Sequence, residues 1–228
     1  MYISHNGKNP RVDPSAYVAP GATICGDVTI GPKCRIMHGA AIIAEGGKIE
    51  IGEQCVILEN AVIRSNTNHS AFIGRYCLIG PNAHVVGCRI DEEVFVATGA
   101  SIFHGAHLGK GSEIRINGVV HLKSYLEPGT MVPIGWIAVG NPAKLFSPDQ
   151  HDEIWKVQEQ LNFPLTVYGM DRSEASMKKI TQRLAKNLGS HQSDQIMKLP
   201  AASCGVSKRN PPKFSFLQQA AGYLNEGG

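Results

Sequence analysis

The sequence of 228 residues lacks the features that mark membrane, secreted and nucleic-acid-binding proteins. Its first residues, MYISHNGKNPR, contain no apolar stretch of a secretory signal. No apolar run approaches the roughly 20 residues that span a bilayer. The net charge of +3 comes without a cluster of lysine and arginine, which argues against an extended nucleic-acid footprint. We therefore expect a cytoplasmic protein that binds neither nucleic acid nor membrane.

Several catalytic and cofactor motifs are also missing. The chain has no P-loop, no GxGxxG turn and no convincing Ser/His/Asp triad, and its six cysteines include no CxxC pair. These absences argue against nucleotide-phosphate sites, serine-hydrolase chemistry and dithiol redox chemistry. Buried free thiols in a reducing compartment are the expected state of the cysteines.

What the sequence does contain is an aliphatic residue at every sixth position, sustained over roughly a hundred residues. The stretch Phe72–Gly87 shows the period most clearly, and a small residue follows four positions after most aliphatic ones. The series comprises Val18, Ile24, Ile30, Ile36, Ile42, Ile51, Ile57, Ile63, Ile73, Ile79, Val85, Ile90, Val96, Ile102, Leu108, Ile114, Val120 and Leu126. A spacing of six fits neither a helix nor a single strand and indicates a repeat architecture.

This repeat predicts an all-β solenoid, a parallel β-helix. Each six-residue unit would form one short strand and a corner, and about six coils of three units would stack as parallel strands. The aliphatic and small residues both point inward. Cys34, Cys55 and Cys77 then lie above one another, so we interpret them as core residues and not as metal ligands.

The repeat is interrupted twice before it ends. Glu45–Lys48 reads as a Gly-rich bulge, and Ser65–Ser70 reads as a polar loop of the kind that often carries function on a rigid scaffold. We divide the chain into a β-helix domain over residues 1–145, a helical appendage over 146–189 and a polar, loosely ordered tail over 190–228.

Two helices are predicted in the appendage. Ser147, followed by proline and aspartate, is typical of a helix start, and Pro164 would end that helix just after Leu161. The second helix is expected over residues 173–188, and a short helix is expected over 216–224.

The second helix is expected to begin in a capping box formed by Asp171 and Glu174. Its apolar stripe comprises Met177, Ile180, Leu184 and Leu188. A stripe of this kind must cover the flank of the solenoid or a neighbouring subunit.

Four short sequence motifs match one family. They are Val18–Thr23, Gly26–Gly31, Val86–Cys88 and Gly140–Lys144. Together with the repeat, they resemble the γ-class carbonic anhydrase group of the hexapeptide-repeat, acyltransferase-like superfamily. The resemblance implies a left-handed β-helix and a bacterial-type homotrimer with its active sites between the subunits.

The resemblance also implies zinc held by three histidines. One of them follows a Val-Ile pair, and the other two belong to a motif similar to Ile-Gly-His-x-Ala-x-Leu-His-Gly-Cys. At the matching positions stand Arg64, Pro81 and Val86. None of them offers the neutral nitrogen that zinc requires. We therefore predict no zinc in the family position and no carbonic anhydrase activity by that route.

Six residues are candidates for a different site. His69 would serve as a general base, the role that a histidine has in hexapeptide acyltransferases, and Glu59 is a second catalytic candidate. The alternative for Glu59 is an ion pair with Arg64 in a dry subunit interface. The ligand-binding candidates are Arg64 for an anion, His84 and His104 for a ligand or a metal, and Lys144 for a phosphate of coenzyme A.

Three functions follow from these candidates. The first is a scaffold or ligand-binding homotrimer that takes a small anion at its subunit interface. The second is an acyltransferase or thioesterase that uses coenzyme A in the inter-subunit cleft. The third is a carbonic anhydrase with a relocated zinc. The sequence therefore leaves open whether the chain is an enzyme, and no cofactor is assigned with certainty.

Overall fold

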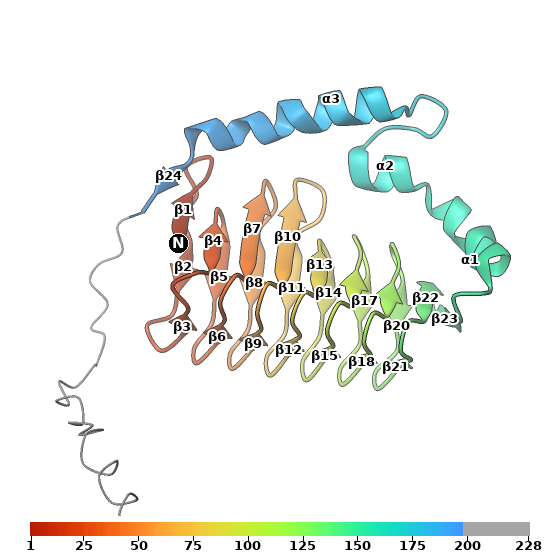
Figure 1. Cartoon of the computed structure of the whole chain (residues 1–228), viewed down its shortest axis with the longest axis horizontal. Helices are drawn as coiled ribbons and strands as arrows, with labels where there is room; N and C mark the ends of the chain where they lie inside the picture. The colour runs from red at the N-terminus through yellow and green to blue at the C-terminus, as the bar shows by residue number, and fades with distance from the viewer. Residues whose placement is uncertain (198–228) are drawn as a thin grey trace, which may run out of the picture. The chain divides into compact units, whose positions relative to one another are not determined.

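A computed structural model describes residues 1–197 and forms a parallel β-solenoid followed by helices (Figure 1). The ten-stranded sheet has the order β23-β22-β19-β16-β13-β10-β7-β4-β1-β24. Its strands are β1 Tyr2–Ser4, β4 Thr23–Cys25, β7 Ala41–Glu45, β10 Val62–Asn66, β13 His84–Val86, β16 Ser101–Ile102, β19 Val119–Val120, β22 Ile137–Gly140, β23 Ala143–Phe146 and β24 Gln195–Ile196. Only the pairs β1–β24 and β22–β23 are antiparallel.

The other two sides of the solenoid are seven-stranded parallel sheets. One contains β2 Arg11–Val12, β5 Val28–Ile30, β8 Ile49–Ile51, β11 Ala71–Ile73, β14 Arg89–Ile90, β17 His107–Leu108 and β20 Tyr125–Leu126. The other contains β3 Tyr17–Val18, β6 Arg35–Ile36, β9 Val56–Ile57, β12 Leu78–Ile79, β15 Phe95–Val96, β18 Glu113–Ile114 and β21 Met131–Val132. The predicted all-β solenoid is confirmed, with seven strands on two sides and eight parallel strands, β1 to β22, on the third, where about six coils were expected.

The six-residue period places the core as predicted. Nearly every aliphatic member of the series is at most 3% exposed, and Val18, on the first coil, is partly exposed. Cys34, Cys55 and Cys77 stack on successive coils, and each thiol donates to a backbone carbonyl of the next coil. The cysteines of this column are therefore core residues, as their register predicted.

The two interruptions of the repeat are neighbours in space. Strands β7 and β10 each run for five residues, in register from Ala41 opposite Val62 to Glu45 opposite Asn66. Both extend beyond the coil, so the Gly-rich bulge and the polar loop lie side by side. This pair of extended strands forms one edge of the cavity described below.

The helical region differs from the prediction in its boundaries. Helix α1 (His151–Gln158) begins four residues after Ser147, whose amide and hydroxyl donate to the side-chain oxygen of Gln150 in a preceding turn. A 3₁₀ turn η1 (Glu159–Leu161) follows. Pro164 does not end the helical region, because a proline is tolerated in a first helical turn, and it lies there in α2 (Phe163–Tyr168).

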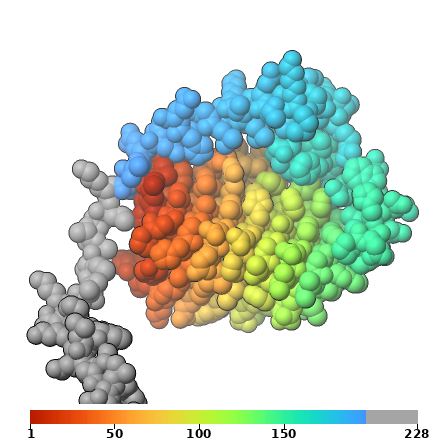
Figure 2. Space-filling model, viewed as in Figure 1, coloured from red at the N-terminus to blue at the C-terminus, as the bar shows by residue number. Residues whose placement is uncertain are grey.

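The long helix α3 (Met177–Leu188) begins at Ser176, whose hydroxyl accepts from the Lys179 amide. The capping box predicted at Asp171 is therefore wrong, because Asp171 instead accepts from Ser173 in the preceding turn. Ile180 is buried, whereas Met177 is 71% exposed and takes no part in the packed stripe. The helix covers the flank of the solenoid, one of the two expected locations (Figures 1 and 2).

After α3 the chain reaches the first coil again. The turn η2 (Gly189–Ser193) leads into β24, which pairs with β1 through Ile3 opposite Ile196. An added strand covers the unpaired edge of the ten-stranded sheet. Residues 190–197, assigned to the polar tail in the sequence, thus have defined partners, and the helix expected over 216–224 lies outside the described residues. Among the helices of residues 1–197, none is long and apolar enough to cross a membrane.

Candidate functional site

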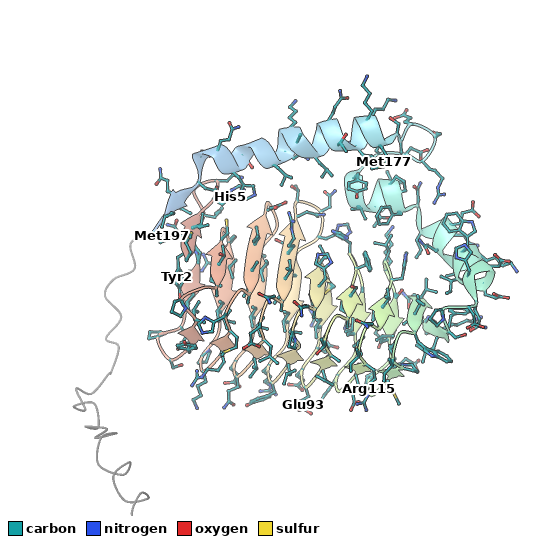
Figure 3. The ribbon with its side chains drawn as sticks, viewed as in Figure 1. Tyr2, His5, Glu93, Arg115, Met177 and Met197 are labelled. Carbon is teal, nitrogen blue, oxygen red and sulfur yellow. The ribbon has the colours of Figure 1, made fainter. Side chains whose placement is uncertain are left out.

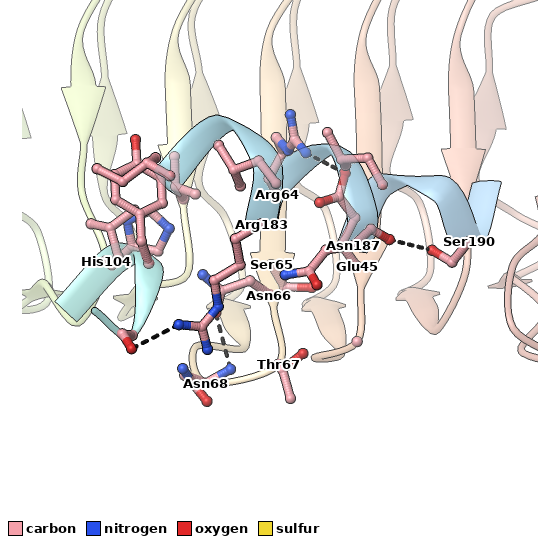
Figure 4. Close-up of a pocket in the computed structure, with 18 of the residues that line it drawn as sticks. Glu45, Arg64, Ser65, Asn66, Thr67, Asn68, His104, Arg183, Asn187 and Ser190 are labelled. Atoms are coloured by element: carbon pink, nitrogen blue, oxygen red, sulfur yellow. Dashed lines mark hydrogen bonds and ion pairs between the residues drawn. The ribbon is translucent and has the colours of Figure 1, made fainter. Parts of the chain in front are cut away.

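A cavity of about 760 Å³ lies between the outer face of the ten-stranded sheet and the segment that carries α2 and α3 (Figure 4). Its floor comes from β7, β10 and β13 and from the turns that follow β1, β7, β10 and β16. Its roof comes from α2, α3 and η2. Side chains alternate along a strand, so the inward position of Ile63 turns Val62 and Arg64 outward toward this space.

Arg64 is the charged residue at the floor of the cavity. Its guanidinium forms an ion pair with Glu45 of the neighbouring strand. Its side chain remains 37% exposed, and a guanidinium has more donors than a single carboxylate uses. Arg64 therefore keeps donor capacity for a second anion in the cavity.

Histidines surround this arginine. His84 lies one strand away, opposite Val62 in the register, and lines the open cavity. His104 follows β16, is 8% exposed, and lines the cavity as well. His69, from the polar loop, meets the ring of His104 edge-on with ring centroids 5.4 Å apart.

The polar loop is held over the sheet by its own hydrogen bonds. The side-chain oxygen of Asn66 accepts from the amides of Asn68 and His69, and the Asn66 and His69 backbones exchange two hydrogen bonds. Gly87 lies beneath the loop with a φ of +50°. A Cβ on Gly87 would lie 2.5 Å from the Cβ of His69 and 3.2 Å from a ring carbon of His104. Only glycine leaves room for both histidines.

The environment keeps these imidazoles neutral. Burial lowers the pKa of His104 to about 4, with smaller contributions from His69, His84 and Arg64. Burial also lowers the pKa of His69, and beside Arg64 the pKa of His84 is lowered as well, again mainly by desolvation. The Nδ1 atoms of His69 and His104 are buried and have no hydrogen-bond partner. Two neutral, unpartnered imidazole nitrogens therefore lie together beside the cavity.

The remaining lining is mixed, with polar side chains from the loop, η2 and part of α3 and apolar ones on the floor and roof. Val86 is next to Arg64 in the register and is 6% exposed, and Phe103 lies on the next coil. The roof adds Phe163, Val167, Tyr168, Ile180, Leu184 and Leu188. A ligand in this space would meet the Arg64 guanidinium at its floor, apolar side chains of α2 and α3, and polar groups that include Arg183.

The predicted site residues divide into two groups. Arg64, His84 and His104 line the cavity, and His69 lies directly behind His104. Lys144 is exposed on β23, and neither it nor Glu59 is among the residues that line the cavity.

The ion pair considered between Arg64 and Glu59 is not formed within the chain. Glu59 is exposed at the corner that precedes β10, in a column with Pro81. Among residues 1–197, the ion-pair partner of Arg64 is Glu45. The extension of β7 and β10 beyond the coil explains the difference, because it brings residue 45 alongside the end of β10.

The residues that the resemblance assigns to the zinc positions, Arg64, Pro81 and Val86, offer no donor that fits a zinc ion. Arg64 is a cation engaged with Glu45, Val86 is a buried aliphatic residue, and Pro81 lies at a corner away from the cavity lining. Zinc sites need neutral imidazole, thiolate or carboxylate donors, and these three residues supply none. We therefore derive no reaction step through a metal at this position.

Two contributions to the cavity had no signal in the sequence. Glu45 stood in a glycine-rich bulge, and Arg183 of α3 now donates to the Gly169 carbonyl at 3.0 Å and lines the roof. Both act through contacts between segments distant in sequence, which a local period does not report.

No family model matches the chain. The chain is 26% identical to gamma carbonic anhydrase 2, a mitochondrial protein of Arabidopsis thaliana, over 217 residues that cover 91% of this chain and 74% of the relative. It is 30% identical to gamma carbonic anhydrase 1, mitochondrial, of the same organism over 153 residues, 64% of this chain and 54% of the relative.

A solved structure shares the architecture. The UDP-N-acetylglucosamine acyltransferase LpxA from Bacteroides fragilis aligns with a TM-score of 0.52 at 16% identity, covering 86% of this chain and 97% of that one. At this identity the likeness concerns the fold alone. The chain is therefore similar in sequence to γ-class carbonic anhydrases, and its fold is that of a β-helical acyltransferase structure.

Proposed function

We propose that the chain binds a small amphipathic carboxylic acid in the cavity beneath α3 and has no carbonic anhydrase chemistry at the family's zinc position. One observation carries the proposal: the half-exposed guanidinium of Arg64 at the floor of a cavity that also has apolar side chains on its floor and its roof. The residues at the three zinc positions support its second half, because they offer no metal donor.

The carboxylate and the apolar part of the ligand would contact different residues of the cavity. The carboxylate accepts hydrogen bonds from the Arg64 guanidinium, which matches its planar geometry. The apolar part contacts Val86 and Phe103 on the floor and Ile180 on the roof. With His84 and His104 neutral, Arg64 is the positive charge on the floor that meets the anion, and Arg183 is a second arginine on the roof.

The protein is proposed to act as a homotrimer, the state implied by its resemblance to the γ-class group. The second seven-stranded sheet supports this with an outward apolar column of Val56, Leu78 and Phe95 on adjacent strands. Rigid, partly exposed apolar columns favour association. Light scattering coupled to gel filtration measures the state directly.

Titration calorimetry with octanoate tests the binding. We expect saturable binding of octanoate, none of octylammonium, and a loss of about tenfold or more in affinity in Arg64→Gln, since a charge-assisted pair contributes about 1.5–3 kcal/mol. Arg115→Gln is the matched control, because Arg115 pairs with Glu113 on another sheet. Equal affinity of Arg64→Gln and the wild type would contradict the proposal.

A second candidate is acyl transfer or thioester hydrolysis, favoured by the unpartnered Nδ1 atoms of His69 and His104. A neutral imidazole takes the proton of a water or an acceptor hydroxyl as its oxygen attacks the thioester carbonyl. The carbonyl–sulfur bond then breaks, and the thiolate takes up a proton. His104 has the better access, because it lines the cavity and His69 does not.

An assay of acetyl-coenzyme A hydrolysis, monitored through the release of the free thiol, tests this candidate. Turnover that falls at least a hundredfold in His104→Gln and persists in His38→Gln would support it, given the typical contribution of a general base. His38 is an exposed corner residue and serves as the control. Absence of turnover, together with no thermal stabilisation by coenzyme A, removes the candidate.

A further inference from the structure

Four potential metal ligands meet where the end of the helical segment returns to the first coil. His5 follows β1, Cys25 ends β4, and His191 and Asp194 belong to η2 and the residue after it. One ligand atom from each lies within 4.8 Å of all the others. Figure 3 shows His5 beneath the end of α3, far along the solenoid from Met177.

The contacts within this group converge on one carboxylate. The Nδ1 atoms of His5 and His191 lie 2.6 and 2.8 Å from the two oxygens of Asp194. The Cys25 thiol lies 3.9 Å from one of these oxygens. The two imidazole rings are stacked with their centroids 4.2 Å apart. His5 and Cys25 are 3% and 2% exposed, whereas His191 and Asp194 are partly exposed, so the group lies at the edge of the buried interior.

We infer that His5, Cys25, His191 and Asp194 form a structural zinc site that fastens the end of the α3 segment to the first coil. Two imidazoles, one thiolate and one carboxylate are a donor set typical of zinc. Tetrahedral zinc with bonds of about 2.0–2.3 Å separates its donor atoms by roughly 3.3–3.7 Å. The three contacts to Asp194 span 2.6 to 3.9 Å and all four donor atoms lie within 4.8 Å of one another, so side-chain shifts without a change of fold would bring them into this range.

Four protein donors leave no open position for water, which distinguishes a structural site from a catalytic one. The inferred site therefore does not restore the chemistry of a γ-carbonic anhydrase. Glu45 supports it from outside, with a carboxylate oxygen 3.5 Å from Nε2 of His191. The same Glu45 pairs with Arg64, so the zinc site and the cavity share one carboxylate.

The zinc site has a clear structural consequence. Ile180 is the one buried residue of α3, and most of the helix surface is exposed. A metal bond from η2 to β4 would fix the far end of this helix and thereby the roof of the cavity. Metal binding stabilises the folded arrangement because the ligands come together only there.

Metal analysis of the untagged full chain tests the inference. After dialysis against zinc and gel filtration, we expect one zinc per chain, and we expect its loss in Cys25→Ser and His5→Gln. Cys88→Ser and His107→Gln are controls, because Cys88 is a buried cysteine outside the group and His107 pairs with Asp91 at the surface. With cobalt in place of zinc, the thiolate charge-transfer band of the wild type should be absent in Cys25→Ser and His5→Gln and retained in both controls.

A second measurement uses the wild-type chain and does not depend on how the variants fold. Removal of zinc by a chelator should increase hydrogen exchange in residues 177–188 and alkylation of Cys25, with Cys88 unreactive in both states. A wild-type chain without zinc overturns the inference, as does zinc retained in both site variants. If the chelator changes neither the hydrogen exchange of residues 177–188 nor the alkylation of Cys25, the inference is overturned as well. The four side chains would then form a hydrogen-bonded cluster without a metal.

Discussion

Replacing Gly87 by alanine tests how the polar loop is held over the site. The residue has a φ of +50°, and alanine in this left-handed region costs about 1–2 kcal/mol. The added Cβ would also lie 2.5 Å from the Cβ of His69 and 3.0 Å from its carbonyl oxygen. Overpacking of this kind costs typically about 1–3 kcal/mol. We therefore expect Gly87→Ala to lower the free energy of unfolding by about 2–5 kcal/mol.

Gly129→Ala separates the two contributions. Gly129 has a φ of +73°, and no atom lies within 4 Å of a Cβ placed on it. It therefore carries the conformational cost without the collision. Equilibrium urea unfolding, followed by circular dichroism with reversibility checked, should give the Gly87 variant an additional loss of about 1–3 kcal/mol. Equal losses in the two variants would refute the packing of the loop against Gly87.

Two further predictions concern His104 and α3. An unfolded imidazole takes up its proton near its ordinary pKa of 6.5 and the buried His104 only near 4, so the unfolded state binds more protons between these values. The free energy of unfolding should therefore fall by about 3 kcal/mol on account of this residue as the pH drops from about 6.5 to 4. In urea unfolding, His104→Gln should flatten this pH dependence, and the control His38→Gln should not. Ile180→Asp should increase hydrogen exchange throughout α3, because it removes a burial contribution of about 1.5–3 kcal/mol, whereas Met177→Asp at a 71% exposed position should leave exchange unchanged.

The sequence predicted the solenoid because its core depends on a local rule. Each coil buries the same two inward positions against its neighbours, so a period of six appears directly in the order of residues. The same period sets the strand register, which pairs Arg64 with Val86 on the outer face.

The rest of the site depends on contacts that no period reports. His5 and Asp194 are 189 positions apart, and His69 meets His104 across two coils. Helix boundaries were less accurate for a similar reason. The amide and hydroxyl of Ser147 donate to the Gln150 side chain, so Ser147 does not cap α1. Asn162 caps α2, and Pro164, which was expected to end a helix, lies in the first turn of α2.

The location of a bromine-labelled carboxylate in a crystal of the protein tests the central claim most directly. With ω-bromooctanoate bound, anomalous diffraction should place the bromine among Phe103, Ile180 and Leu184, with the carboxylate against the Arg64 guanidinium. No metal should lie beside Arg64 or Val86. A bromine peak outside this cavity, or a metal ion between Arg64 and Val86, would contradict the account.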